Sequence, residues 1–340
     1  MGHLQQLTIS RIFKTSRYWR QGLIAMVFTS SLTACNPNLS EPTLSSSPYS
    51  LPPSASQTVE HALGEVKIPT HPQRIIVLHD TFLLDPVLAL GIKPTGITTF
   101  AADVGSPVRG IEAEQIANVE IVGDGHQPNL EKILALKPDL ILARESQSEI
   151  YSQLSGIAPT VAVPETLISF KERLRFIAQI FDKEAVAEQV IDQYWHRVEQ
   201  FKTAMGQRLD VTEVSVLVFA WGMMATPSSE LTCSKVLVDI GIRRPPIQER
   251  LANSSSDSPP LSLEVISEHD ADVILLITDR QANTSNYLNS PIWSTLQAVQ
   301  NNQVYQVDIN RWHGNGPLAA NLILDDLFKY LVNNPDLKGS

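Results

Sequence analysis

The chain has 340 residues, of which 43% are hydrophobic and 18% charged, and its formal net charge at pH 7 is −10. This length exceeds what one compact core usually holds and favours two domains. The acidic balance argues against a nucleic-acid partner.

Residues 1–34 have the pattern of an export signal. Basic residues from Arg11 to Arg20, with no acidic residue in the segment, precede the apolar run "GLIAMVFTSSL" at residues 22–32. A resident membrane helix needs about 20 apolar residues, so this run is too short to be one. It predicts a secretory signal peptide.

The signal ends in Leu32-Thr33-Ala34-Cys35, which resembles the bacterial lipobox. This resemblance implies that Cys35 is diacylated and becomes the new N-terminus, and two acyl chains together anchor a protein stably on a membrane. Two alternatives stay open: an ordinary signal peptide with an incidental cysteine, or a disulfide with Cys233, the only other cysteine. Residues 35–57 are rich in Ser and Pro and lack periodicity, so they are expected to form a tether.

Beyond the tether, strand and helix patterns alternate. In residues 58–165, apolar runs such as "RIIVLH" and "DLILA" predict buried parallel strands, and the segments between them have helical spacing. Asn129 is expected to cap a short helix that begins at Leu130. Residues 208–336 repeat this design, with strands predicted at "VSVLVFA", "DVILLIT" and "VYQVD" and a closing helix at "LAANLILDDLFKYLVNN".

A long helix is predicted between these two regions. Apolar residues recur in steps of three or four from Val186 to Met205, and neither Gly nor Pro interrupts them before Gly206. One helix over about 184–206, within a helical region at 166–207, would join the two parts. We therefore expect an α/β fold with two lobes, each with a parallel-rich sheet flanked by helices, joined by a single long backbone helix.

One phrase occurs in both predicted lobes. "LEKILALKPDLIL" at residues 130–142 and "LEVISEHDADVIL" at residues 263–275 agree at six of thirteen positions, including Glu131 and Glu264. This echo supports two lobes of similar design.

Several segments together resemble the ferric-siderophore and cobalamin binding proteins of ABC importers. The segments include "HALGEVKIPTHPQRIIVL", "NLEKILALKPDLIL" and "GNGPLAANLILDDLFKYL", and the resemblance extends over residues 58–335. It implies an exported, lipid-anchored, monomeric receptor facing the periplasm or cell exterior. Such a receptor binds its ligand between the lobes and delivers it to an ABC permease dimer with its ATPase. The expected ligand is an Fe(III)-siderophore complex whose iron is held by the chelator, with neither a cofactor nor a direct metal site in the protein.

The resemblance also implies a role for the two repeated glutamates. In that family, a glutamate on each lobe meets arginine on each permease subunit, and Glu131 and Glu264 match those positions. The alternative is that both carboxylates only complement helix N-termini.

Ligand-binding candidates follow the predicted strands, because open parallel sheets bind ligands at the carboxyl ends of their strands. Arginine can clamp the oxygens of an anionic chelate, tryptophan can form a flat apolar wall, and histidine also follows two of these runs. The candidates are His79, His126, Arg144, Trp221, Arg311 and Trp312.

The sequence also leaves alternative functions open. A cobalamin or haem receptor has the same scaffold, and a non-transport sensor is a further alternative. An exported lipid-anchored hydrolase is the rival of another class, although the sequence contains neither a G-x-S-x-G elbow nor a P-loop.

Overall fold

The computed structural model describes residues 55–99, 108–220, 222–252, 260–278, 284–334 and 337. The chain divides into two compact units, Met1–Ser50 and Leu51–Ser340, and every described residue lies in the second. Trp221, Cys35 and the predicted signal peptide lie outside the described residues, as does most of the predicted tether.

The first sheet of the second unit has five parallel strands in the order β5-β4-β3-β6-β7. They are β3 (Ile75–Val77), β4 (Gly96–Thr99), β5 (Glu120–Asp124), β6 (Leu140–Arg144) and β7 (Thr160–Val163). Two buried apolar clusters pack on this sheet, one around Val77 and Leu142 and the other around Ile76 and Ile141. These alternate residues of β3 and β6 point to opposite faces, so both faces are buried.

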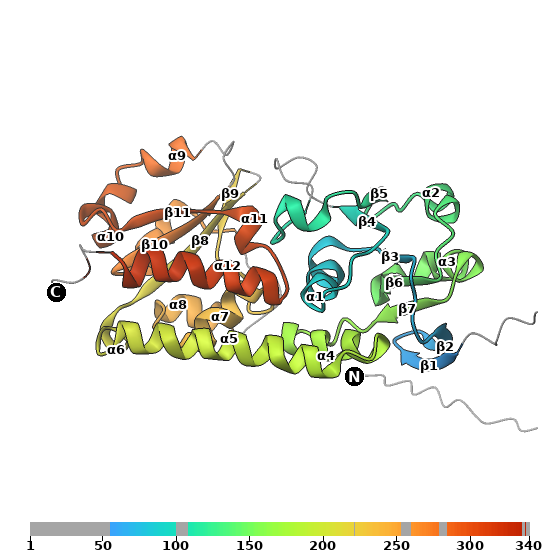
Figure 1. Cartoon of the computed structure of the whole chain (residues 1–340). Helices are drawn as coiled ribbons and strands as arrows, with labels where there is room; N and C mark the ends of the chain where they lie inside the picture. Colours follow the sequence, from blue (N-terminus) through green and yellow to red (C-terminus); the bar gives the residue numbers. More distant parts are fainter. Residues whose placement is uncertain are drawn as a thin grey trace, which may run out of the picture. The chain divides into compact units, whose positions relative to one another are not determined.

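Short helices connect these strands (Figure 1). They are a π-helical turn η1 (Asp80–Leu84), α1 (Asp85–Ala89), the 3₁₀ helices η2 (Ala113–Ile116) and η3 (Glu145–Ile150), α2 (Leu130–Ala135) and α3 (Tyr151–Ile157). A hairpin of β1 (Ser56–His61) and β2 (Gly64–Pro69) joins β7 through the Ala62 N–H, which donates to the Ala162 carbonyl at 3.0 Å. We call this part, together with α4 (Phe170–Ile180), the N lobe.

The second sheet has four strands in the order β11-β10-β8-β9. β8 (Val214–Ala220), β10 (Val273–Thr278) and β11 (Val304–Asp308) are parallel, and β9 (Met223–Ala225) pairs antiparallel with β8. The main helices of this part, the C lobe, are α7 (Thr232–Ile240), α8 (Pro246–Ala252) and α12 (Pro317–Leu327). Its shorter helices are α6 (Arg208–Val211), η4 (Leu263–His269), α9 (Ser285–Leu288), η5 (Trp293–Thr295), α10 (Gln297–Gln300), α11 (Ile309–Trp312) and η6 (Phe328–Val332).

Helix α5 (Glu184–Met205) belongs to both lobes (Figure 1). Its 22 residues span about 33 Å at 1.5 Å per residue. Ala187 and Ile191 lie in the N-lobe core, whereas Tyr194 and Val198 lie in the C-lobe core. One continuous helix therefore contributes to two cores, which is how it holds the lobes together.

The predicted fold class is confirmed, with local differences. The prediction missed the hairpin, β5 and β9, because a two-stranded hairpin and short strands give weak periodicity. The buried stripe at the start of α5 uses Ala187 and Ile191 rather than the predicted Val186 and Val190, which are only partly buried. Among the described residues, we find no helix with the length and apolar character needed to cross a membrane.

Candidate functional site

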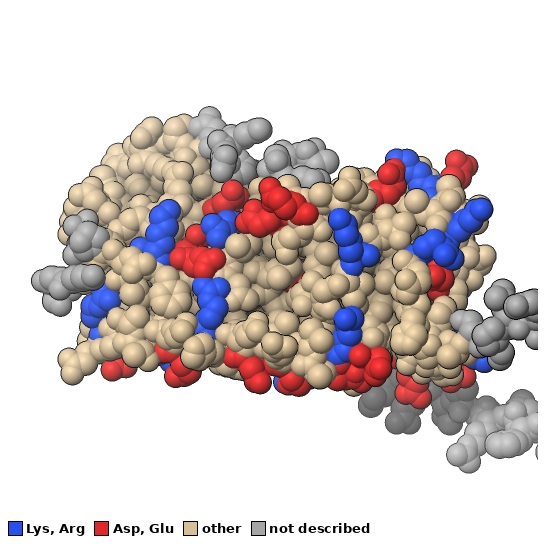
Figure 2. All heavy atoms as spheres, viewed as in Figure 1, with Lys and Arg blue, Asp and Glu red and all other residues tan. Residues whose placement is uncertain are grey.

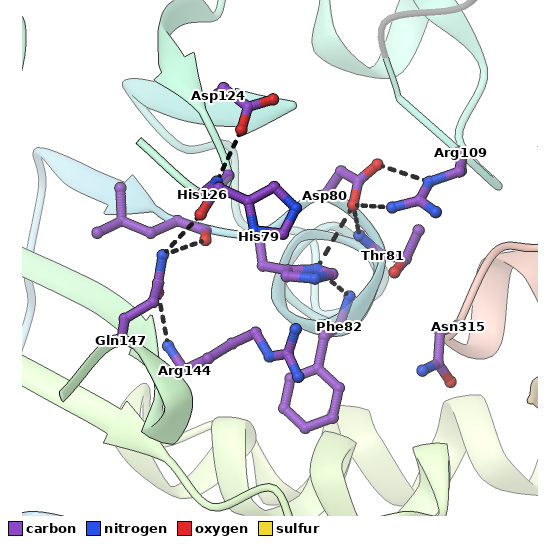
Figure 3. Close-up of polar contacts among 12 residues, drawn as sticks. His79, Asp80, Thr81, Phe82, Arg109, Asp124, His126, Arg144, Gln147 and Asn315 are labelled. Atoms are coloured by element: carbon purple, nitrogen blue, oxygen red, sulfur yellow. Dashed lines mark hydrogen bonds and ion pairs between the residues drawn. The ribbon is translucent and has the colours of Figure 1, made fainter. Parts of the chain in front are cut away.

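Polar side chains gather where the N-lobe strands end (Figure 3). His79 follows β3, His126 follows β5, and Arg144 is the last residue of β6. The structure therefore brings together three of the predicted residues, because parallel strands place their carboxyl ends at one edge of a sheet. Phe82 and Arg109, which were not predicted, lie beside them in Figure 3.

His79 is buried at the start of η1, and its Nδ1 accepts a hydrogen bond from the Phe82 N–H at 3.0 Å. Burial lowers the pKa of His79 well below its ordinary value, and Arg144, Arg109, Arg173 and His126 lower it further. His79 is therefore neutral at pH 7, with Nδ1 serving as an acceptor. Three arginines and His126 therefore lie close enough to His79 to lower its pKa.

Arg109 is held by a buried carboxylate. Its Nε and Nη2 donate to the two oxygens of Asp80, both at 3.0 Å, and Asp80 is fully buried. The next residue, Gly110, donates its N–H to the Asn310 carbonyl of the C lobe at 2.5 Å. Arg109 thus lies where the two lobes meet.

Phe82 lies near two guanidinium groups. The Arg173 guanidinium carbon is 4.0 Å from the centroid of the Phe82 ring, and that of Arg144 is 5.2 Å away. Arg173 is fully buried on α4 and donates across the lobes to the backbone carbonyl of Asn315 at 2.6 Å and to its Oδ1 at 3.1 Å. Burial lowers the pKa of Arg173 to about 10, so it stays charged at neutral pH.

Asp85 makes a second buried connection between the lobes. Its carboxylate accepts from the N–H groups of Leu318 at 2.9 Å and Ala319 at 3.0 Å, at the start of α12. Burial raises the pKa of Asp85 to about 7, although these two hydrogen bonds and Arg173 act in the opposite direction. A Cβ atom at Gly316 would lie only 2.2 Å from the Asp85 carboxyl carbon, so this close approach requires glycine.

Trp312 and Arg311 do not lie as expected for side chains that line a ligand site. Trp312 is fully buried and donates its indole N–H to Asp326 Oδ2 at 2.9 Å, so it forms no exposed wall. Arg311 Nη1 lies 3.2 Å from Asp326 Oδ1, and Nη2 donates to the Leu322 carbonyl at 3.4 Å. Both side chains face α12, where the Asp326 carboxylate contacts both of them.

The other predicted residues have simpler positions. His126 is exposed, and its backbone N–H donates to Asp124 Oδ1 at 2.8 Å. Glu131 is exposed in the first turn of α2, where the Asn129 side chain accepts from the Lys132 N–H at 2.9 Å, as predicted for the cap. Glu264 is likewise exposed in the first turn of η4.

Sequence reasoning missed Arg173 for an identifiable reason. On α4 it follows Phe170 by three residues and is followed by Leu174 and Ile177, all of them buried. A charged residue at a core position of an apolar helical stripe was the available signal. Arg109 has no comparable signal, because no predicted strand precedes it.

A separate groove of about 880 Å³ runs along α5. Its lining includes Glu188, Asp192, His196, Arg197 and Asn321. Figure 2 shows acidic side chains along the edge that α5 forms. Arg197, which lines the groove, is paired with Asp325 and Asn321. Within the described residues, no group of three or more His, Cys, Asp or Glu side chains is arranged so that it could hold one metal ion, in this groove or elsewhere.

Comparison with known proteins gives consistent matches. The family model described as "Periplasmic binding protein" matches residues 76–310. The probable siderophore-binding lipoprotein YfiY of Bacillus subtilis is 32% identical over 314 residues, covering 88% of this chain and 94% of that protein.

Two further matches come from other organisms. The Fe(3+) dicitrate-binding periplasmic protein FecB of Escherichia coli is 28% identical, with 82% of this chain and 91% of that protein covered. The crystal structure of Staphylococcus aureus SirA complexed with staphyloferrin B aligns with a TM-score of 0.70 and 28% identity, covering 81% of this chain and 98% of that one.

Proposed function

Because the chain belongs to the periplasmic binding protein family, we propose that it is the substrate-binding component of an ABC importer and captures an anionic ferric siderophore between its lobes. The ligand lies at the N-lobe strand ends and is then handed to the membrane permease. Relatives named for siderophore and ferric citrate binding support this class of ligand.

The position of the Arg144 side chain is the observation that carries the proposal. The side chain is 30% exposed at the end of β6, and its guanidinium carbon lies 5.2 Å from the centroid of the Phe82 ring. Arginine keeps its charge and presents a planar set of donors that fits carboxylate or catecholate oxygens. Phe82 beside it supplies an apolar surface, and Arg109, which also lies near His79, adds positive charge.

Tryptophan-fluorescence titration of the purified protein in detergent tests the ligand class. The panel contains ferric citrate, a ferric catecholate, a neutral ferric hydroxamate, haem and cobalamin. We expect saturable binding of the anionic ferric chelates and no turnover of a chromogenic ester or glycoside. Binding of cobalamin or haem alone would overturn the ligand assignment.

The anchor is the second part of the proposal. Residues 1–34 act as the signal peptide, Cys35 is lipidated, and residues 35–57 tether the lobes at 58–165 and 208–336, joined by the helical region 166–207. Two relatives are named as lipoproteins, which supports it. Replacing Cys35 with Ala should release the protein from membranes or leave it unprocessed. A correctly cleaved variant that stays on the membrane would contradict the proposal.

Docking to the permease is the third part. Glu131 and Glu264 are exposed in the first turns of α2 and η4, one on each lobe, and a two-fold permease dimer needs two similar contacts. Charge reversal should impair docking more than simple removal, because exposed ion pairs govern orientation and association rate. The Glu131→Lys/Glu264→Lys variant should bind ligand normally but fail to stimulate the transporter's ATPase. Normal stimulation would leave both carboxylates as complements of the helix N-termini only.

A further inference from the structure

Arg144 has a carboxylate of the chain itself beside it. Its Nη2 lies 2.5 Å from Oε1 of Glu165, and the two side chains are 30% and 35% exposed. Glu165 comes just after β7, whose Val163 pairs with Arg144 of β6. The ends of two neighbouring parallel strands thus place an acid where an anionic ligand would meet Arg144.

This ion pair is only partly formed. Arg144 Nε and Glu165 Oε1 are themselves buried atoms, and among the described residues neither has a partner with hydrogen-bond geometry. By contrast, Arg109 bonds through two nitrogens to both oxygens of the fully buried Asp80. A partly exposed, singly contacted pair contributes little to stability, whereas a bidentate pair with a buried carboxylate is costly to break. Arg109 is therefore fixed, and Arg144 is exchangeable.

The backbone keeps the Glu165 carboxylate within reach of Arg144. The Glu165 N–H donates to Oε2 of Glu145 at 3.0 Å, and Glu145 directly follows Arg144. The Arg144 N–H donates to Oε1 of Gln147 at 2.9 Å, which fixes the same turn (Figure 3). A displaced Glu165 side chain can therefore return to Arg144 without rearrangement of the strands.

We propose that Glu165 is a built-in competitor that sets the affinity for anionic ligands: its carboxylate occupies Arg144 in the empty protein and is displaced by an anionic oxygen of the ligand. This inference rests on the proposed function. An anionic chelate that uses Arg144 must displace the Glu165 carboxylate and so loses the free energy of that ion pair, whereas a neutral chelate that does not use Arg144 leaves the pair in place. Glu165 thus lowers the affinity for ligands that use Arg144.

The test is an affinity comparison with ferric citrate as the anionic probe and a neutral ferric hydroxamate as the other probe. Glu165→Gln keeps the shape of the side chain and removes its charge, so it should tighten ferric citrate binding about three-fold, as expected for a partly exposed ion pair. Binding of the neutral chelate should not change. Glu165→Asp keeps the charge but shortens the reach, and it should also tighten ferric citrate binding.

Two controls separate direct competition from a general charge effect. Glu145→Gln removes a neighbouring negative charge that does not pair with Arg144, and it should change affinity less than Glu165→Gln does. In an Arg144→Gln background, Glu165→Gln should have no effect on ferric citrate, because the residue it competes for is gone.

The outcomes distinguish this inference from the proposed function. Unchanged or weaker ferric citrate binding by both Glu165 variants, while the parent binds, would overturn the competitor role and leave the function intact. Failure of the parent to bind any ferric chelate would overturn the function, and the competitor role with it. A circular-dichroism melt verifies that each variant is folded.

Discussion

The two lobes place different chemistry at equivalent positions. In the N lobe, residues at strand ends gather at one edge, with Arg144 and His79 close to Phe82 and Arg109 near His79. In the C lobe, Arg311 and Trp312 also come after a strand, β11, yet both face the Asp326 carboxylate of α12. A position after a strand therefore makes a residue a candidate for the site, and the element packed behind it decides where its side chain points.

The C lobe contributes to the junction mainly through its backbone. The chain from Gly314 to Ala319 supplies the Asn315 carbonyl to Arg173 and two N–H groups to Asp85. A Cβ at Gly314 would lie 2.8 Å from the Cα of Gly110, so the two lobes meet there without side chains between them. The N lobe supplies the charged side chains Asp85 and Arg173, and the C lobe supplies the backbone N–H and C=O groups that bond to them.

The largest expected effect comes from breaking this connection at Asp85. Asp85→Ala leaves the N–H groups of Leu318 and Ala319 without their acceptor and Arg173 without its nearby buried carboxylate. We expect the free energy of unfolding to fall by about 3 kcal/mol or more, measured by urea denaturation. Asp325→Ala is the control, because the Asp325 side chain on α12 is 51% exposed, and it should cost at most about 1 kcal/mol. A loss below 1 kcal/mol for Asp85→Ala would show that the lobes do not depend on this contact.

The next prediction compares the two strand-end arginines in ligand binding. Arg144→Ala should weaken binding of an anionic ferric chelate about ten-fold or more, because a charge-assisted hydrogen bond contributes about 1.5 to 3 kcal/mol. Arg311→Ala should change affinity less than two-fold, since its guanidinium is engaged by α12. Fluorescence titration measures both. The reverse order would mean that the C lobe, not the N lobe, supplies the anion contact.

The sequence predicted the fold better than it predicted the site. Continuous apolar runs located β8 and β10 closely, because buried parallel strands need apolar residues on both faces. Side-chain direction at the strand ends depends on partners distant in the chain, such as Asp326 for Trp312 and Asn315 for Arg173. Such pairings leave no local pattern, so Arg173 was missed and Trp312 was misplaced.

The pH dependence of stability should have opposite signs for Asp85 and His313. The pKa of Asp85 is raised to about 7, so its contribution is complete below its ordinary value of 3.8 and is lost as the pH rises towards 7. Burial, followed by Arg109, lowers the pKa of His313 to about 4, so its contribution is present above 6.5 and is lost as the pH falls towards 4.

These opposing terms can be separated by urea unfolding between pH 4.5 and 6.5. His313→Asn should make the free energy of unfolding rise less steeply with pH than in the parent, by up to about 1.4 kcal/mol per pH unit. Asp85→Asn should make it rise more steeply by a similar amount. Parallel pH profiles for the parent and both variants would contradict the raised pKa of Asp85 and the lowered pKa of His313.

The smallest expected effect concerns the two glutamate-bearing turns. The Asn129 side chain caps α2 by accepting from the Lys132 N–H at 2.9 Å, whereas Ser262 makes no side-chain cap bond to η4 within the described part of the chain. Asn129→Ala should therefore lower the free energy of unfolding by about 1 kcal/mol, and Ser262→Ala should leave it within about 0.3 kcal/mol of the parent. Urea denaturation of both variants measures the difference. An equal loss at both sites would mean that the turns carrying Glu131 and Glu264 are stabilised alike. A loss at Asn129 alone would show that α2 depends on a side-chain cap and η4 does not, although both begin with the repeated sequence.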